Sequence, residues 1–259
     1  MGVVYFFVVL TSCIIGAVVG LGGGVIIRPL LDAIGYHSIM NIAFLSSVSV
    51  LVMAVVSTVK KVQDGTKIDI KTAAMVSVGA LVGGMLGNFA LEYLVTVFDT
   101  EASVQLIQTI CTIFFLIVAV YLTAKVKWQY ELKNKALFPI IGVFLGAMAV
   151  FLGIGGGPIN VPVFVILFAL PVKQATAFSI VVIFFSHLFR IIAMGFTVGF
   201  AYFDLQFLFF IIPAAIIGGI LGAVISGKLT DNAVKKAFIA TMFLLLSINI
   251  YNGITFIMY

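Results

Sequence analysis

Six uninterrupted apolar segments constrain this chain more than any other feature of its sequence. They cover residues 38–59, 72–91, 102–124, 174–198, 205–227 and 237–257, and they contain almost no charged side chains. A helix needs roughly 20 apolar residues to cross the hydrocarbon core of a bilayer, so each segment predicts one membrane-spanning helix. Since 63% of all residues are hydrophobic and only 9% are charged, we expect an all-α polytopic membrane protein embedded in the lipid bilayer.

Two further apolar stretches, residues 1–34 and 136–170, are interrupted by glycine and proline. "GLGGG" occupies residues 20–24, and "GIGGGP" occupies residues 153–158. Each patch divides its stretch into arms of about 12 to 20 residues, which are marginal or too short to cross a bilayer singly. Backbone groups freed in lipid have no water to bind, so such breaks are tolerated only inside protein or beside a water-filled cavity. We therefore expect two re-entrant helical hairpins.

The distribution of charge predicts the orientation of the chain in the membrane. Lysines gather at 60–71, at 125–135 and at 228–236, and Lys173 follows the second broken stretch. The positive-inside rule places all of these in the cytoplasm. The intervening connections carry Glu92, Asp99, Glu101 and Asp204 without any lysine. Counting crossings then puts both termini outside the cytoplasm in a multi-pass protein of the cell (inner) membrane. Because the formal charge of +5 reflects these loops, we expect no nucleic-acid partner.

The two halves of the sequence repeat one another at a nearly constant offset. Gly20, Gly22, Gly23, Gly24 and Pro29 align with Gly153, Gly155, Gly156, Gly157 and Pro162, Ala43 and Phe44 with Ala177 and Phe178, and Asp69 with Asp204. Because equivalent loops have opposite charge bias, we expect two inverted-topology repeats, each a broken re-entrant hairpin plus three transmembrane helices. The first repeat covers 1–124, a cytoplasmic linker covers 125–135, and the second repeat covers 136–259. Inverted repeats with broken helices are typical of transporters whose site lies near the bilayer midplane.

The glycine patches predict an anion site. Behind each patch a short helix begins, and its first N–H groups and positive dipole end favour a negative ligand, which glycine allows to approach the backbone. The predicted binding residues are Gly22, Gly23, Gly24, Gly155, Gly156 and Gly157. The alternative is that these glycines only let helices pack closely. Their duplication at equivalent positions favours the ligand site, whereas Gly79, Gly83, Gly87, Gly218 and Gly222, which lie on single helix faces, are interpreted as packing seams.

Both arginines fall within membrane segments. Arg28 follows the first patch, where an unpaired charge is costly, so it is the best candidate for an anion contact. The alternative is an ion pair with Asp32, four residues along the same helix. Arg190 lies nearer the outer surface, where snorkelling to the interface is an equal alternative.

Uncharged polar side chains accompany these arginines at membrane depth. His187 either carries a coupling proton or is a packing histidine. The remaining predicted substrate contacts are Asn41, Ser46, Asn160, Ser179 and Ser186, although serines also bond to helix carbonyls.

No motif for a cofactor, a metal or catalysis is present. Neither glycine patch is followed by Lys-Ser/Thr or fits a dinucleotide fingerprint. Cys13 and Cys111 have no metal-ligand spacing, and no HExxH, GxSG or pair of acids at depth occurs. We therefore expect no cofactor, no metal and no enzyme activity.

At "GLGGGVIIRPLL" and "GIGGGPINVPVF" the sequence resembles the sulfite exporter TauE/SafE family, whose hallmark is two such repeats in a small multi-span protein. The resemblance covers nearly the whole chain. It implies secondary transport of small sulfur-containing anions such as sulfite, organosulfonates or related organic acids, driven by an ion gradient. The resemblance does not extend to Arg28 in both repeats, because Val161 stands at the equivalent place in the second one. A passive anion channel would use the same residues and differ only in lacking coupling. An intramembrane enzyme such as a hydrolase is a further alternative, which is disfavoured because Ser186 and His187 are adjacent and so point to different helix faces.

Overall fold

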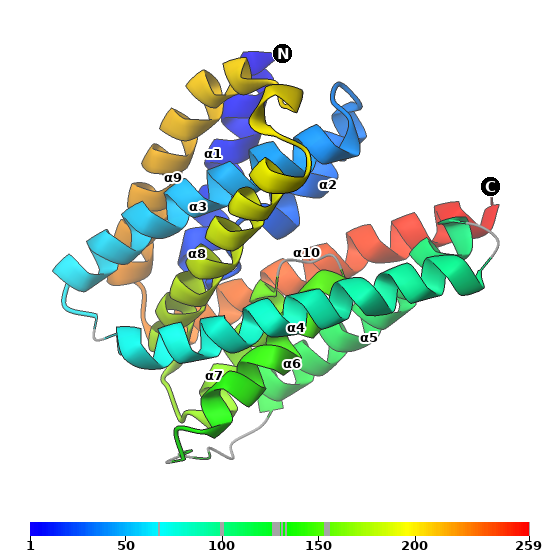
Figure 1. Cartoon of the computed structure of the whole chain (residues 1–259). Coiled ribbons are helices and arrows are strands. Elements are labelled where there is room, and N and C mark those ends of the chain that lie inside the picture. The colour runs from blue at the N-terminus through cyan, green and yellow to red at the C-terminus, as the bar shows by residue number, and fades with distance from the viewer. Residues whose placement is uncertain are drawn as a thin grey trace.

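The computed structural model describes residues 1–66, 68–98, 101–125, 130, 132, 134–152 and 156–258, and its regular structure there is entirely helical (Figure 1). Two of the helices are short 3-10 turns. In chain order the helices are α1 (Gly2–Val19), α2 (Gly24–Ile34), α3 (Ile39–Gln63), α4 (Ile70–Val97), α5 (Glu101–Lys125), α6 (Leu137–Phe151), α7 (Gly157–Leu167), α8 (Val172–Thr197), η1 (Phe200–Tyr202), η2 (Leu205–Phe207), α9 (Leu208–Lys228) and α10 (Asp231–Met258).

The described residues contain seven helices that are long and apolar enough to cross a membrane. Six of them, α3, α4, α5, α8, α9 and α10, correspond to the six predicted spans. The seventh is α1, which the sequence analysis assigned to the first arm of a re-entrant hairpin, with a length at the margin for a span. With 18 residues α1 just reaches spanning length, because its break comes later in the first stretch than the break between α6 and α7 comes in the second.

Each broken stretch forms a hairpin whose two ends lie together. In the first, Tyr5 near the start of α1 hydrogen-bonds to His37, which follows α2, with an Oη to Nδ1 distance of 2.7 Å. In the second, Leu132 N, before α6, donates to Leu167 O at the end of α7 at 3.1 Å. The chain therefore enters, breaks and returns to the same end of the molecule in both cases, as the apolar pattern predicts.

Long helices of one half pack against hairpin arms of the other. Figure 1 shows α1 beside α9 at one side of the molecule and α4 beside α6 at the other. Glycines line both contacts: Gly79, Gly83 and Gly87 lie against the backbone at Pro139, Val143 and Ala147, and Gly218 and Gly222 lie against Cys13 and Ala17. The interpretation of these glycines as packing seams is confirmed. The residue numbers rise together in both contacts, so each helix pair is parallel.

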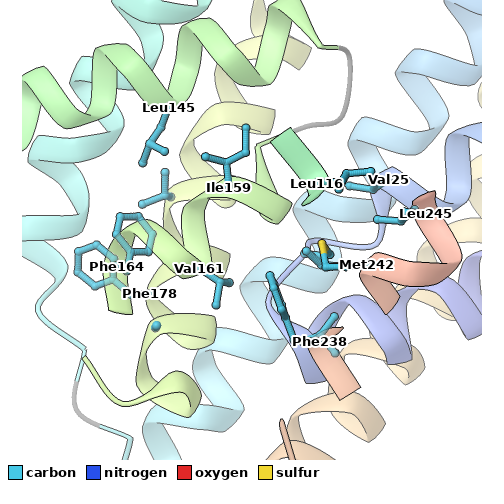
Figure 2. Close-up of a cluster of buried hydrophobic side chains, with 14 of the residues drawn as sticks. Val25, Leu116, Leu145, Ile159, Val161, Phe164, Phe178, Phe238, Met242 and Leu245 are labelled. Atoms are coloured by element: carbon cyan, nitrogen blue, oxygen red, sulfur yellow. The ribbon is translucent and has the colours of Figure 1, made fainter. Parts of the chain in front are cut away.

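Two hydrophobic cores hold the helices together, and each draws on both halves of the sequence. One is built mainly on α1, α2, α3 and α9, and the other on α5, α6, α7, α8 and α10. Figure 2 shows the second core, in which Val25 from α2 lies near Leu116 of α5 and Leu245 of α10. The two halves are therefore interleaved in space, and α8 contributes to both cores.

The lysines that the structure describes gather at one end of the molecule, which we call the lysine end. Lys173 Nζ donates to Gly227 O at 2.6 Å, and Lys235 Nζ donates to Ala124 O at 3.2 Å. Lys135 interacts electrostatically with Asp69, and Lys61 interacts with Lys173. The sequence-based grouping of loops into two ends agrees with these contacts. Lys67, Asp99, Lys127 and Lys133 lie outside the described residues.

Candidate functional site

The helix breaks are made by glycines in the left-handed region of backbone space. In the first break Gly20, Gly22 and Gly23 have φ of 78°, 82° and 72°. In the second, Gly156 has φ of 80°. Gly23 and Gly156 align in the sequence repeat, and each precedes a short helix with nearly the same conformation, since ψ is −28° and −27°. Left-handed φ is costly for any residue with a Cβ, so the breaks require glycine here. The predicted site residue Gly155 lies outside the described residues.

The first break lies at mid-height of two long helices. A Cβ placed on Gly22 would lie 2.9 Å from Ile183 and 3.4 Å from Val50. Val50 lies halfway along α3 (Ile39–Gln63), and Ile183 lies close to the middle of α8 (Val172–Thr197). The glycine backbone is therefore enclosed by the central parts of one helix from each half.

The two breaks touch each other. A Cβ placed on Gly157, the first residue of α7, would lie 2.5 Å from the carbonyl oxygen of Leu21. Leu21 is itself buried, between Gly20 and Gly22. The start of α7 therefore abuts the first break directly, and the glycine at 157 permits this close approach.

Side chains from neighbouring helices satisfy the carbonyl groups at the carboxyl ends of α1 and α6. At the first break, Ala17 O accepts from Lys61 Nζ at 2.9 Å, and Gly20 O accepts from Ser179 Oγ at 2.7 Å. At the second, Phe151 O accepts from Gln108 Nε2 at 2.7 Å. An unpaired carbonyl in a membrane interior costs several kcal/mol, so these bonds make the breaks tolerable.

At the amino ends of α2 and α7, backbone bonds already use some N–H groups: those of Ile26 and Ile27 donate to Gly23 O, and those of Ile159 and Asn160 donate to Gly156 O. Pro158 has no N–H. Among the described residues this leaves the N–H groups of Gly24 and Val25 in α2, and that of Gly157 in α7, without a partner. Neither start has a side-chain cap, and the first N–H groups of a helix have no acceptor inside the helix. The positive end of the helix dipole is added to these free donors. The carboxyl ends of α1 and α6 are therefore capped by other helices, whereas each amino end keeps N–H groups without a partner among the described residues.

Two polar side chains converge on the start of α2. A Cβ on Gly24 would lie 3.5 Å from Ser46 Oγ and 3.9 Å from His187 Cε1. Both residues are buried, and the buried Nδ1 of His187 has no hydrogen-bond partner among the described residues. Ser47 and Ser49 bond to the carbonyls of Ala43 and Leu45, which leaves Ser46 as the free hydroxyl of this cluster in the part of the chain described.

The start of α7 carries a similar group. Asn160, in the first turn, is only 3% exposed. Its Oδ1 finds no partner in the described residues, and a Cβ on Gly156 would lie 3.5 Å from both ends of its amide. Each helix start therefore has a buried polar side chain with unused hydrogen-bonding capacity, which in native proteins calls for a ligand, water or ion.

The two arginines lie close enough to interact. Arg190 interacts electrostatically with Arg28 and with His187. The alternative ion pair of Arg28 with Asp32 is present: Arg28 Nε lies 3.9 Å from Asp32 Oδ2, and the two side chains are 35% and 42% exposed. Such a pair contributes at most about 1 kcal/mol. Arg28 lies in the second turn of α2, where its neighbours are Asp32 and Arg190.

Three other predicted contacts are used elsewhere. Asn41 Oδ1 accepts from Asp204 N at 2.9 Å near the amino-terminal end of the molecule, away from the breaks. Ser186 donates to Val182 O within α8. Ser179 lies at the first break but donates its hydroxyl to Gly20 O. These residues hold backbone in place in this conformation.

Sequence reasoning missed Lys61 as part of the first break, because it assigned this residue to a loop. The side chain is only 4% exposed. A helical signal was available, since Met53, Ser57 and Lys61 follow at four-residue spacing on one buried face of α3. Among the described residues, no group of three or more His, Cys, Asp or Glu side chains is placed to hold a metal ion.

Comparison with known proteins gives one family and one curated relative. The family described as "Sulfite exporter TauE/SafE" matches residues 5–249. The chain is 23% identical over 270 residues to "Probable membrane transporter protein YunE" of Bacillus subtilis (strain 168), an alignment that covers 93% of this chain and 94% of that protein. No solved structure matches at a significant level.

Proposed function

Because the chain belongs to the sulfite exporter TauE/SafE family, we propose that it is a secondary transporter of small sulfur-containing anions such as sulfite, organosulfonates or related organic acids. The family and its relative make it a membrane transporter and not an enzyme. The substrate, the coupling and the binding residues are the proposal.

One observation carries the proposed site: two uncapped helix starts lie at touching breaks, and each has a buried polar side chain without a partner. A deprotonated oxyanion such as sulfite only accepts hydrogen bonds, so it suits the remaining N–H groups of Gly24, Val25 and Gly157. Ser46 and the Nδ1–H tautomer of His187 would donate to it, as would Asn160 with its amide turned to present Nδ2. Arg28 and Arg190 would balance its charge.

The two halves are proposed to be inverted repeats, 1–124 and 136–259, joined by the linker 125–135. The packing of the helices supports this proposal. Helix α1 of the first half packs on α9 of the second half, and α6, the equivalent of α1, packs on α4, the equivalent of α9. Local details support it too: Asp69 caps the start of α4, and Asp204, its equivalent, caps η2. Transporters built this way carry their site between the repeats.

The lysine end is proposed to face the cytoplasm, which puts both termini outside. An impermeant maleimide should not label Lys135→Cys in intact cells, and labelling there would contradict this orientation.

Transport is proposed to be coupled to an ion gradient, with His187 as a candidate proton carrier beside the anion.

The anion site is tested by replacing Gly24 with alanine. Gly24 is the first residue of α2, and its φ is not positive, so alanine fits the backbone there. The added methyl group would stand between the helix start and Ser46. Losing one charge-assisted bond of about 1.5 to 3 kcal/mol predicts a 10- to 150-fold weaker affinity for sulfite, measured by titration calorimetry on purified protein.

The matched control is Gly227→Ala in α9, where the nearest atom to an added Cβ is Asp64 Oδ2 at 3.8 Å. This variant should bind sulfite like the unmodified protein. If Gly24→Ala also binds normally while both variants keep the same melting temperature, the α2 start is a packing device and the anion binds elsewhere.

A further inference from the structure

A chain of hydrogen bonds outside the proposed anion site joins three segments at the amino-terminal end of the molecule. Tyr5 Oη lies 2.7 Å from His37 Nδ1, and His37 Nε2 lies 3.4 Å from Asp204 Oδ2. Tyr5 belongs to α1, His37 lies between α2 and α3, and Asp204 precedes η2 and α9. These segments meet at the top of Figure 1. Two of these residues come from the first half of the sequence and one from the second.

The histidine is enclosed, yet its carboxylate partner is reachable from solvent. The His37 side chain is 8% exposed and that of Asp204 is 39% exposed. The rings of Tyr36 and Phe207 pack edge-on to the imidazole, with distances of 4.8 Å and 4.5 Å between the ring centroids. The aromatic rings fix the orientation of His37, and the exposed Asp204 carboxylate connects it to solvent.

The segment that carries Asp204 is attached to α3 by two further contacts. Asp204 N donates to Asn41 Oδ1 at 2.9 Å. The adjacent Phe203 stacks on Phe44, with ring centroids 4.2 Å apart. Movement of this connection away from α3 would therefore break the histidine link, the asparagine bond and the ring stack together.

The titratable groups around His37 come from several neighbouring elements. Tyr5 faces it from α1, Tyr36 from its own connection, and Asp204 from the connection before α9. Asp32 of α2 interacts electrostatically with Tyr5 but is paired loosely with Arg28. The Asp204 carboxylate is therefore the charge in direct contact with the imidazole.

We propose that His37 is a proton-binding site whose protonation holds the two halves together at the amino-terminal end. In the neutral form Nε2–H donates to Asp204 and Tyr5 donates its O–H to Nδ1. After a proton is taken up from solvent, both ring nitrogens donate, Tyr5 accepts, and an imidazolium faces the carboxylate. The link is stronger when His37 carries the second proton and weaker when the imidazole is neutral.

The consequence for transport rests on the proposed function. If the amino-terminal end faces outside, an acidic exterior keeps that end closed, and loss of the proton releases it. A contact between the halves at this end has to open whenever that end admits substrate. The proton site itself is independent of where the anion binds.

Hydrogen exchange of the 198–208 segment tests this site on the full-length protein without any anion. We expect protection in this segment, corrected for intrinsic exchange rates, to be roughly three- to tenfold greater at about pH 5.5 than at about pH 8. Asp204→Asn keeps a side chain able to cap η2 but removes the charge, so its protection should be equal at the two pH values. His37→Gln should behave in the same way.

Asp69→Asn is the matched control, since Asp69 caps α4 as Asp204 caps η2 and has no histidine partner in the described residues. It should keep the pH dependence of the unmodified protein. Equal protection at both pH values in the unmodified protein, or an unchanged pH ratio in both Asp204→Asn and His37→Gln, would overturn the proposal. Neither result bears on sulfite binding by Gly24→Ala, so the two proposals fail separately.

Discussion

Neighbouring glycines at the first break serve different purposes. Gly23 has φ of 72°, so a Cβ there is strained whatever space surrounds it. Gly24 is helical, so alanine fits its backbone, and an added methyl group would meet Val50 at 3.1 Å, Ser46 Oγ at 3.5 Å and His187 Cε1 at 3.9 Å. A variant of Gly23 or Gly156 would therefore test folding and binding at once, whereas a Gly24 variant separates them.

Arg28 is the residue at which a functional and a structural interpretation diverge most. Arg28→Gln keeps hydrogen bonding but removes the charge, and the account predicts about a 10- to 150-fold weaker affinity for sulfite. Arg28→Lys should recover only part of it, because an ammonium group lacks the forked geometry of guanidinium. Arg190→Gln, closer to the end of α8, should weaken binding less. Calorimetry on the three variants gives the order.

Unchanged sulfite affinity in Arg28→Gln would mean that backbone dipoles hold the anion alone. Arg28 would then act only as the partner of Asp32.

For single residues, the sequence predicted which glycines break the helices and that Arg28 follows the first break closely. It did not predict what each hydroxyl or amide bonds to. Ser179 and Asn41 were expected to contact substrate, yet they bond to Gly20 O and Asp204 N. Such partners lie far away in the sequence, so no local pattern reports them.

At the scale of elements, a broken helix in a membrane exposes carbonyl groups that other helices must satisfy. α3 supplies Lys61 to α1, and α5 supplies Gln108 to α6. The hairpins are therefore held by the long helices beside them, and the breaks are part of the packed interior.

Lys61→Met removes the donor to Ala17 O while keeping most of the side-chain volume. An unsatisfied buried carbonyl costs about 1 to 3 kcal/mol, so the melting temperature of the purified protein should fall by several degrees. Lys60→Met is the control, since Lys60 forms a partly exposed pair with Asp64 that contributes about 1 kcal/mol or less. Equal melting temperatures for the two variants would show that Lys61 does not support the break.

The sequence predicted the elements well because apolar length and glycine are local signals. It placed six spans and both hairpins. It set the start of the last helix at 237, whereas α10 begins at Asp231, because Ala233 N donates to Thr230 Oγ1 and so allows a polar first turn. It also left out α1 as a helix of spanning length, since 18 residues lie at the lower limit.

For the whole molecule, the interleaving of the two halves could not be foreseen from the aligned repeats. The aligned repeats show which helix of one half corresponds to which helix of the other. They do not show that α1 packs on α9 or that α4 packs on α6. The seams of small residues at Gly79, Gly83 and Gly218 make these contacts close, and only the assembled chain shows which surface each one meets. The proposed anion site depends on this interleaving, because it brings the second break against the first.

The most direct test of the central claim is uptake of radiolabelled sulfite by proteoliposomes that contain the purified protein. Uptake of a radiolabelled sulfonate and of a radiolabelled carboxylate is measured in parallel, and each assay is run with and without an imposed pH gradient. The account predicts that the pH gradient drives sulfite accumulation above its equilibrium level, that Gly227→Ala retains this uptake and that Gly24→Ala loses it. Sulfite that only equilibrates down its own gradient would indicate a passive channel, and no uptake of any of the three anions would contradict the proposed function.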